Sequence, residues 1–336
     1  MMHGTMWNVP AASIVRTATV DNPTVSVVLP TYNRGAIVLQ SVQSVLDLEE
    51  QNFEIIAVDD GSQDDTVGIL AKLDHPRLTV ISLAGNRGAG FARNAGITLS
   101  RAPYVAFLDS DDLWLPGRLE QPVSVLRRHP NVGVVLSAFT TEKKRKLTHH
   151  QMPSRLYEGD EFERLVARHV LQPTTSGLTV RKDLLMTVGG FNAALRWMED
   201  RDLVMRTARH AGGATIDKPL WHKRWQSDSI SSNHNTYFPS LLTFLSNHLI
   251  YKDQELEFRN YLIARHLAKT TYHSGILAAM RDYSEARDRL SPRLPPASIL
   301  LMKYFSARRS RRAQQQELLM QDGKRRHIVE PYSVLS

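Results

Sequence analysis

The sequence contains no cysteine and no long apolar run, and both absences narrow the possibilities. None of the 336 residues is cysteine, which excludes disulfide bonds and thiolate metal sites and fits a reducing compartment. No stretch of about 18 residues is uninterruptedly apolar, so we expect no transmembrane helix. Residues 1–22 lack a basic start followed by a long apolar core, so no signal peptide is expected. Together these absences favour a cytoplasmic protein.

Two nucleotide-binding fingerprints are also missing. The first candidate strand is followed by Pro30–Gly35 (PTYNRG) instead of the G-x-G-x-x-G of dinucleotide-binding folds. A second glycine-rich stretch, Gly88–Gly90, is followed by Arg93 where the third glycine should stand. The sequence has no Walker phosphate-binding loop either. Nicotinamide chemistry and P-loop hydrolysis are therefore disfavoured.

Positive charge is in excess and is concentrated near the end of the chain. The formal net charge is +8, and residues 281–336 carry 12 Lys/Arg against six Asp/Glu. Such a tail suits an anionic surface, such as the inner face of the cell membrane or a polyphosphate. A solvated, partly disordered end explains the charge equally well.

Short β-branched runs alternate with helical patterns through the first third of the chain. This alternation predicts βαβ units and a parallel sheet. Residues 1–22 show no period and are expected to form a loose extension, whereas helical patterns replace strands from Tyr237 to about Arg289. The candidate strands are Val25–Leu29, Phe53–Val58, Leu78–Leu83 and Tyr104–Leu108, with a fifth at Val132–Ala138 and a short one at Ala214–Pro219.

Polar loops follow each of the first four strands. In parallel sheets ligands bind beyond the carboxyl ends of the strands, so these loops are expected to form one site. The loop Asp109–Asp112 (DSDD) places like charges together, and a divalent metal that also holds a phosphate would relieve their repulsion. A solvated turn with an aspartate helix cap is the alternative explanation.

Seven segments, in order, resemble the family 2 inverting glycosyltransferases of the GT-A fold. They cover about residues 24–232 and imply an α/β fold, a Rossmann-like sandwich with a mainly parallel central sheet. The segments are VSVVLPTYNR (25–34), VDDGSQDDT (58–66), NRGAGFARNAGI (86–97), YVAFLDSDDLWLPGRL (104–119), VGGFNAAL (188–195), MEDRDLVMR (198–206) and LWHKRWQSDSIS (220–231). With the periodicity and the charge described above, we expect an N-terminal extension (1–22), a catalytic domain (23–235) that carries the resemblance, a helical C-terminal region (236–297) and a basic tail (298–336).

The resemblance implies a nucleotide-sugar site. Tyr32 could stack on the base, and Asp60 could accept a hydrogen bond from a uracil ring. Asp111 would ligate Mg²⁺ or Mn²⁺, with Asp109 reaching the metal or the ribose, while Asp112 supports the loop. Trp221 or Trp225 is a candidate for stacking on a sugar. The implied nucleotide-sugar contacts are Pro30, Tyr32, Asn33, Arg34, Asp60, Asn86, Arg93, Asp109 and Arg224.

The chemistry itself is expected at Glu199 and Asp200. By the resemblance, Asp200 is the general base that takes the proton from the acceptor hydroxyl, and Glu199 orients the acceptor or braces the base. Without the resemblance, the two carboxylates would be explained as N-terminal helix residues favoured by the helix dipole.

The implied function is transfer of a sugar from a UDP-sugar to a hydroxyl of a glycan or lipid-linked acceptor in cell-surface polysaccharide synthesis, with no nucleic-acid partner. A sugar-phosphate nucleotidyltransferase is one alternative, but it needs a glycine-rich loop with catalytic Arg and Lys that PTYNRG does not supply. A non-catalytic member that binds a nucleotide-sugar is the other, and it would be expected to lose Asp111 or Asp200.

Overall fold

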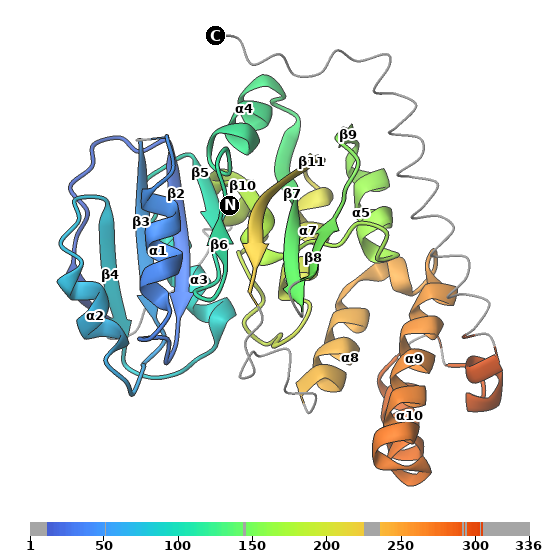
Figure 1. Cartoon of the computed structure of the whole chain (residues 1–336). Coiled ribbons are helices and arrows are strands. Elements are labelled where there is room, and N and C mark those ends of the chain that lie inside the picture. The colour runs from blue at the N-terminus through green and yellow to red at the C-terminus, as the bar shows by residue number, and fades with distance from the viewer. Residues whose placement is uncertain are drawn as a thin grey trace, which may run out of the picture. The chain divides into compact units, whose positions relative to one another are not determined.

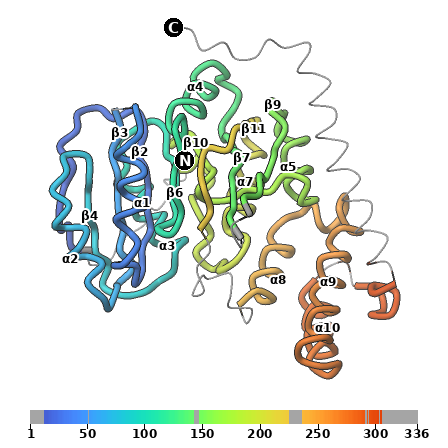
Figure 2. Tube along the Cα trace, in the orientation of Figure 1, coloured from blue at the N-terminus to red at the C-terminus, as the bar shows by residue number. Residues whose placement is uncertain are grey.

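The computed structural model describes residues 12–50, 52–143, 146–224, 236–290, 292, 294–302 and 304. Figure 1 shows the elements, and Figure 2 follows the course of the chain. The chain divides into two compact units. The first comprises Met1–Glu163 and Pro173–Ser232, and the second comprises Arg164–Gln172 and Asn233–Ser336. The second unit therefore begins close to the expected start of the helical region, but it also takes in residues 164–172.

One eleven-stranded sheet forms the frame of the first unit, with a main order of β1-β4-β3-β2-β5-β10-β7-β11-β6. The four neighbours β4, β3, β2 and β5 are parallel, as the alternation of strand and helix predicts. Their carboxyl ends therefore meet at one edge. These strands are β2 (Val25–Thr31), β3 (Phe53–Asp59), β4 (Leu78–Leu83) and β5 (Tyr104–Phe107).

Helices cover both faces of the sheet, with α4 packed on β7 and β10. Val42 of α1, Leu70 of α2 and Leu126 of α4 join one fully buried cluster on one face. Ala92 and Ala95 of α3 pack on the opposite face. The covering helices are α1 (Val38–Leu46), α2 (Thr66–Lys72), α3 (Ala89–Leu99) and α4 (Glu120–Arg128).

The second half of the sheet is mixed. The antiparallel strand β10 (Leu178–Arg181) lies between β5 and β7 (Val132–Lys143), and the sequence did not predict it. β11 (Gly212–Lys223) runs parallel to β7. The smaller elements are β6 (Leu113–Trp114), β8 (Lys146–His150), β9 (Arg155–Tyr157), α5 (Gly159–Ala167), the 3₁₀ turn η1 (Thr175–Gly177), α6 (Lys182–Val188) and α7 (Glu199–Ala208).

Three expectations about element boundaries are wrong. Residues 12–16 are not a loose extension, because Ala12–Arg16 forms β1, which pairs antiparallel with β4. The first strand does not stop at Leu29 but continues through Pro30, since β5 has already ended there and the missing N–H removes no ladder bond. β11 extends beyond Pro219 because the register shifts on both sides of that proline and the pairing with β7 resumes.

The second unit is helical. It contains α8 (Tyr237–Asn247), the 3₁₀ turn η4 (Leu249–Tyr251), α9 (Leu256–Ser274) and α10 (Ile276–Arg289). α9 and α10 form a hairpin around Gly275, whose φ of +88° is a left-handed conformation that suits glycine. His266 of α9 is hydrogen-bonded to Asp282 of α10 at 2.8 Å and stacks on Phe238 of α8.

Among the residues described, no helix combines the length and apolarity that a membrane span requires. Most of the basic tail, to which membrane contact was assigned, lies outside the described residues, as does Trp225.

Packing of α3 on β2 gives a stability prediction. A Cβ added at Gly96 would lie 2.4 Å from Cγ1 of Val28, a fully buried side chain. Overpacking costs about 1–3 kcal/mol, and the better helix propensity of alanine returns about 1 kcal/mol. We therefore expect Gly96→Ala to lower the free energy of unfolding by up to about 2 kcal/mol in urea denaturation.

Gly85→Ala is the matched control, since a Cβ there meets nothing within 4 Å. It should change the free energy of unfolding by no more than about 0.5 kcal/mol. Adding Val28→Ala to Gly96→Ala should cost less than the sum of the two single changes. A Gly96→Ala protein that is more stable than wild type by about 1 kcal/mol, the full gain in helix propensity, would contradict the close contact.

Candidate functional site

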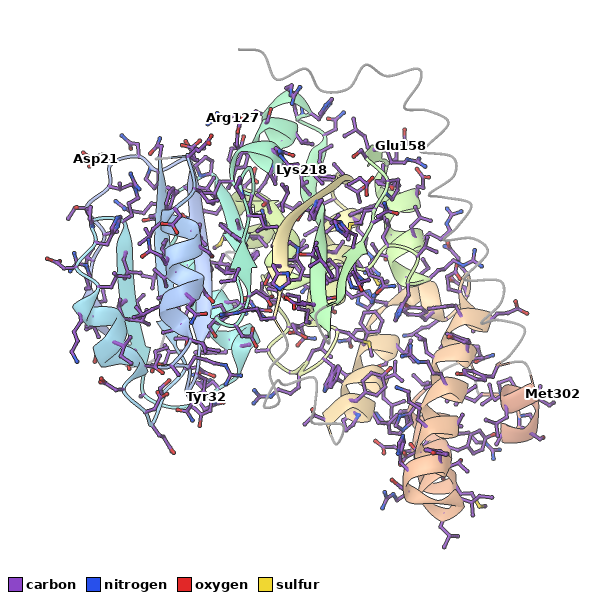
Figure 3. All side chains as sticks on the ribbon, viewed as in Figure 1. Asp21, Tyr32, Arg127, Glu158, Lys218 and Met302 are labelled. Atoms are coloured by element: carbon purple, nitrogen blue, oxygen red, sulfur yellow. The ribbon has the colours of Figure 1, made fainter. Side chains whose placement is uncertain are left out.

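The loop after β2 is tied to the loop after β3. Asn33 has a φ of +50°, its backbone N–H donates to Ser62 Oγ at 2.8 Å, and its Oδ1 accepts from the backbone N–H of Gln63 at 2.8 Å. The backbone N–H of Arg34 donates to Thr66 Oγ1 at 2.9 Å. Tyr32 is exposed and lies at the end of the strands opposite Asp21 (Figure 3). These two loops thus form one rigid floor with an accessible aromatic ring.

Asp60 ties the next loop to this floor. Its two carboxylate oxygens accept hydrogen bonds from the backbone N–H groups of Arg87 at 2.9 Å and Gly88 at 2.6 Å. Burial raises the pKa of Asp60, which lies beneath the turn that carries the exposed Asn86. The carboxylate therefore shapes the turn. Each oxygen keeps a second lone pair that could accept one more hydrogen bond.

Arg93 of α3 joins two groups of carboxylates. Its Nη2 lies 2.7 Å from Asp109 Oδ1 after β5, and its Nη1 lies 3.2 Å from Glu199 Oε1 at the start of α7. The guanidinium is buried, lies over the ring of Phe191, and its Nε has no hydrogen-bond partner among the described residues. The nearby carboxylates raise the pKa of Arg93 despite its burial, so it remains a cation.

The Glu199–Asp200 pair begins α7 directly after Met198, whose φ of +65° turns the chain into the helix. Burial raises the pKa of Glu199 to about 7, Arg93 opposes the rise, and Asp200 adds to it. Burial also raises the pKa of Asp200, whose Oδ1 accepts the backbone N–H of Arg201 at 2.7 Å. Carboxylates with raised pKa values in a polar site can exchange protons near neutral pH.

The acidic loop after β5 is held from beneath. Ser176 Oγ donates to Asp112 Oδ2 at 2.6 Å and accepts from the backbone N–H of Asp109 at 3.1 Å. This contact confirms that Asp112 supports the loop. Burial, together with Asp109, raises the pKa of Asp111. Three carboxylates held this close favour a cation among them.

Arg224, directly after β11, contacts the acidic loop. Its Nε donates to the backbone oxygen of Asp111 at 2.7 Å, and its Nη1 donates to Gln40 of α1. Its Nη2 is buried and has no hydrogen-bond partner in the described part of the chain. An unsatisfied guanidinium N–H beside a carboxylate loop could donate to an anionic ligand such as a diphosphate.

The sequence did not predict the role of Arg118, which lies beneath the acidic loop. Arg118 is fully buried and donates to the backbone oxygens of Ser176 and Leu178 and to Thr179 Oγ1. Burial lowers its pKa to about 9. No sequence pattern links Arg118 to a turn some sixty residues away. The candidate sugar-stacking residue Trp221 is instead buried against Phe139, at a ring separation of 4.5 Å.

The oxygen donors of the acidic loop fit a hard divalent cation. Among the described residues no group of three His, Cys, Asp or Glu side chains could hold a metal. Asp109 and Asp111 could therefore supply at most part of a coordination shell. Mg²⁺ in particular is commonly bound by one or two carboxylates together with substrate phosphates.

Comparison with known proteins gives related sequences. A family model described as Glycosyl transferase family 2 matches residues 26–196. An uncharacterized glycosyltransferase of Haemophilus influenzae is 26% identical over 233 residues, which are 67% of this chain and 76% of that protein. WfgD of Escherichia coli, a UDP-Glc:alpha-D-GlcNAc-diphosphoundecaprenol beta-1,3-glucosyltransferase, is 31% identical over 109 residues, 32% of this chain and 43% of WfgD.

Solved structures share the fold. The S. aureus protein TarS, crystallised in complex with UDP-GlcNAc, matches with a TM-score of 0.63 and 18% sequence identity. The match covers 89% of this chain and 92% of that chain. This likeness confirms the predicted α/β sandwich of the GT-A type.

The raised pKa of Glu199 gives a prediction about stability. Its folded-state pKa of about 7 lies above the ordinary value of 4.5, so folding favours the protonated form. The stability that this proton contributes is fully present below pH 4.5 and is lost as the pH rises through about 7. Without metal, wild type should lose about 3 kcal/mol of unfolding free energy over this range relative to Glu199→Gln.

Urea denaturation with a chelator at both ends of the pH range measures this difference. Glu158→Gln, which changes an exposed carboxylate, is the control and should keep the wild-type pH dependence. The same pH dependence in Glu199→Gln and wild type would contradict the buried, proton-holding position of Glu199.

Proposed function

Because the chain belongs to glycosyl transferase family 2, it is a glycosyltransferase, and we propose that it transfers a sugar from a UDP-sugar to an acceptor hydroxyl with inversion. One observation carries the proposal. Arg93 contacts both Asp109, in the loop after β5, and Glu199, at the start of α7. The loop expected to bind the donor and the helix start expected to supply the base therefore lie next to the same guanidinium. A donor held by one half and a base in the other is the arrangement that a direct displacement needs.

In the proposed reaction, Asp200 accepts the proton of the acceptor hydroxyl. The hydroxyl oxygen then forms a bond to the anomeric carbon of the donor sugar from the face opposite the diphosphate. The bond from that carbon to the diphosphate oxygen breaks, and the nucleoside diphosphate leaves with the electron pair. A single displacement inverts the configuration and needs one base and no protein nucleophile. The raised pKa of Asp200 makes it a stronger base than an exposed aspartate.

Glu199 and Arg93 position the base. Arg93 holds Glu199 through Nη1, and Glu199 in turn lies next to Asp200 in the chain. A Glu199 carboxyl with a pKa of about 7 can donate or accept a hydrogen bond with the acceptor near neutral pH. This pairing supports a role for Glu199 in orienting the acceptor.

We assign a divalent cation, Mg²⁺ or Mn²⁺, to Asp111 with Asp109. When bound, the cation supplies positive charge for the leaving diphosphate. Arg224 adds a second positive group, because its guanidinium contacts the backbone of Asp111. Asp109 also keeps Arg93 in place, which leaves Asp111 as the main protein ligand in this assignment.

UDP is the proposed nucleotide. TarS was crystallised with UDP-GlcNAc, and WfgD uses UDP-Glc, which support a UDP-sugar donor here. In this assignment Pro30, Tyr32, Asn33 and Arg34 contact the base and ribose, together with Asp60, Asn86 and Arg93. WfgD acts on a diphosphoundecaprenol-linked sugar, which supports a glycan or lipid-linked acceptor in cell-surface polysaccharide synthesis. Such an acceptor suits a cytoplasmic enzyme working at the inner face of the membrane.

Nucleotide release tests the proposed function. UDP release from UDP-glucose, UDP-galactose and UDP-GlcNAc with Mn²⁺ should be detected for wild type, and Asp200→Asn should lower kcat by about 10²–10⁴-fold, the usual contribution of a general base. Activity should also fall at acid pH, because Asp200 must lose its proton to act, and its raised pKa places the loss above the ordinary aspartate range.

Asp160→Asn is the matched control, since Asp160 is also a first-turn carboxylate, in α5. Asp160→Asn should keep full activity. A loss of activity in Asp200→Asn alone would then come from the missing base, and not from the loss of a carboxylate at a helix N-terminus in general. Full activity in Asp200→Asn would reject the base assignment alone. A wild type that neither binds nor cleaves any UDP-sugar would reject the proposed donor.

Binding of Mn²⁺ tests the metal assignment without turnover. Titration of Mn²⁺ in the presence of UDP, followed by water proton relaxation, should show one site in wild type. Asp111→Asn should weaken this binding by about tenfold or more, because one charged ligand is lost. Asp65→Asn, an exposed carboxylate at the start of α2, is the control. Equal Mn²⁺ affinity in Asp111→Asn and wild type would remove Asp111 from the metal site.

A further inference from the structure

The tip of the α9–α10 hairpin presents an apolar surface with no packing partner among the described residues. Residues 271–277 are all exposed at the turn around Gly275. In α10, Met280 lies next to both Ile276 and Leu277 on the helix surface, because residues three and four positions apart are neighbours there. The exposed apolar side chains are Tyr272 (85% exposed), Ile276 (66%), Leu277 (80%) and Met280 (62%).

This apolar tip is attached to a rigid hairpin. Leu267 and Ala279 are buried on the inner faces of α9 and α10, and His266 joins the two helices through Asp282. The exposed side chains of the tip therefore lie outside the hydrophobic core of this unit. Leaving this much apolar surface in water is costly, and such patches commonly mark contact sites.

The charge around the tip is positive. Residues 258–281 contain four Lys/Arg, of which Arg259 is buried, and no Asp or Glu. Lys269 is exposed near the end of α9, and the side chain of Arg281 is 81% exposed beside Met280. The first carboxylate after the tip, Asp282, is mostly buried: its Oδ2 contacts His266 Nε2 at 2.8 Å, and its Oδ1 lies 3.8 Å from Nε of Arg281. The exposed charged side chains next to the apolar tip are thus the cations Lys269 and Arg281, and residues 258–281 include no carboxylate.

We propose that this tip, formed by Tyr272, Ile276, Leu277 and Met280 with Lys269 and Arg281, inserts into the headgroup region of an anionic lipid bilayer. Apolar side chains enter the interface while cations pair with lipid phosphates, which is how peripheral helices bind acidic membranes. Tyrosine suits this position because its ring is apolar and its hydroxyl is polar. The positive charge favours an acidic lipid surface over a second copy of this protein, because two basic tips would repel each other.

Vesicle flotation with the full chain tests this proposal. Vesicles of phosphatidylcholine with about a quarter phosphatidylglycerol should bind the wild type, and vesicles of phosphatidylcholine alone should bind it weakly. Ile276→Ser with Leu277→Ser should weaken binding to the acidic vesicles by tenfold or more. Arg281→Glu should weaken it by about fivefold or more, and raised salt should weaken wild-type binding, since both reduce the attraction to acidic headgroups.

Leu249→Ser and Lys252→Glu are matched controls in the same unit. Both residues are exposed, and they precede α9, whose 19 residues span about 28 Å. The controls should bind acidic vesicles like wild type. All the changed positions are exposed, so circular dichroism and thermal melts should stay unchanged.

Two results would overturn the proposal. The first is acidic-vesicle binding that is absent in wild type or equal in the wild type and the tip variants. The second is a wild-type dimer that the Ile276→Ser, Leu277→Ser protein loses while it keeps vesicle binding, measured by light scattering; the tip would then be a contact between copies. Neither result depends on the proposed donor or acceptor, because both are measured without substrate.

Discussion

The buried ion pairs of Arg93 are the interaction on which the rest of the site depends. One guanidinium on α3 contacts Asp109 on one side and Glu199 on the other. The guanidinium is buried, whereas 33% of the Asp109 side chain and 19% of the Glu199 side chain are exposed. Without the cation, two partly desolvated carboxylates would lack a counter-charge, which is costly. The site therefore requires α3, the loop after β5 and the start of α7 to be fixed together. The turn through Met198 and the hydrogen bonds of Asn94 to the backbone of Phe191 help to fix them.

The same burial prepares the carboxylates for chemistry. Burial raises the pKa of both Glu199 and Asp200; Arg93 opposes the rise in both, and Asp200 adds to the rise in Glu199. A structure selected for stability alone would not keep two adjacent desolvated carboxylates at a helix start. The second support lies beneath Asp109–Asp112, where Ser176 and Arg118 hold the acidic loop in place.

Hydrophobic patterns along the sequence predicted the strands whose residues carry such a pattern themselves. The β-branched runs of β2 to β5 and the polar residues at their ends predicted the parallel strands and the edge where the loops gather. The elements that escaped prediction are fixed by partners distant in sequence. β10 is a four-residue strand defined by β5 and β7, and β1 is a short edge strand defined by β4. The pairing of Arg93 with Glu199 spans 106 positions, so spacing could not indicate it.

The stereochemistry of transfer tests the central claim most directly. That claim is a single displacement in which one base, Asp200, acts opposite a diphosphate leaving group. Proton NMR of the product formed from an α-linked UDP-sugar reports the configuration of the new glycosidic bond. The account predicts a β-linked product from the first turnovers onward. An α-linked product would contradict it, because retention needs either two displacements or attack from the face of the leaving group.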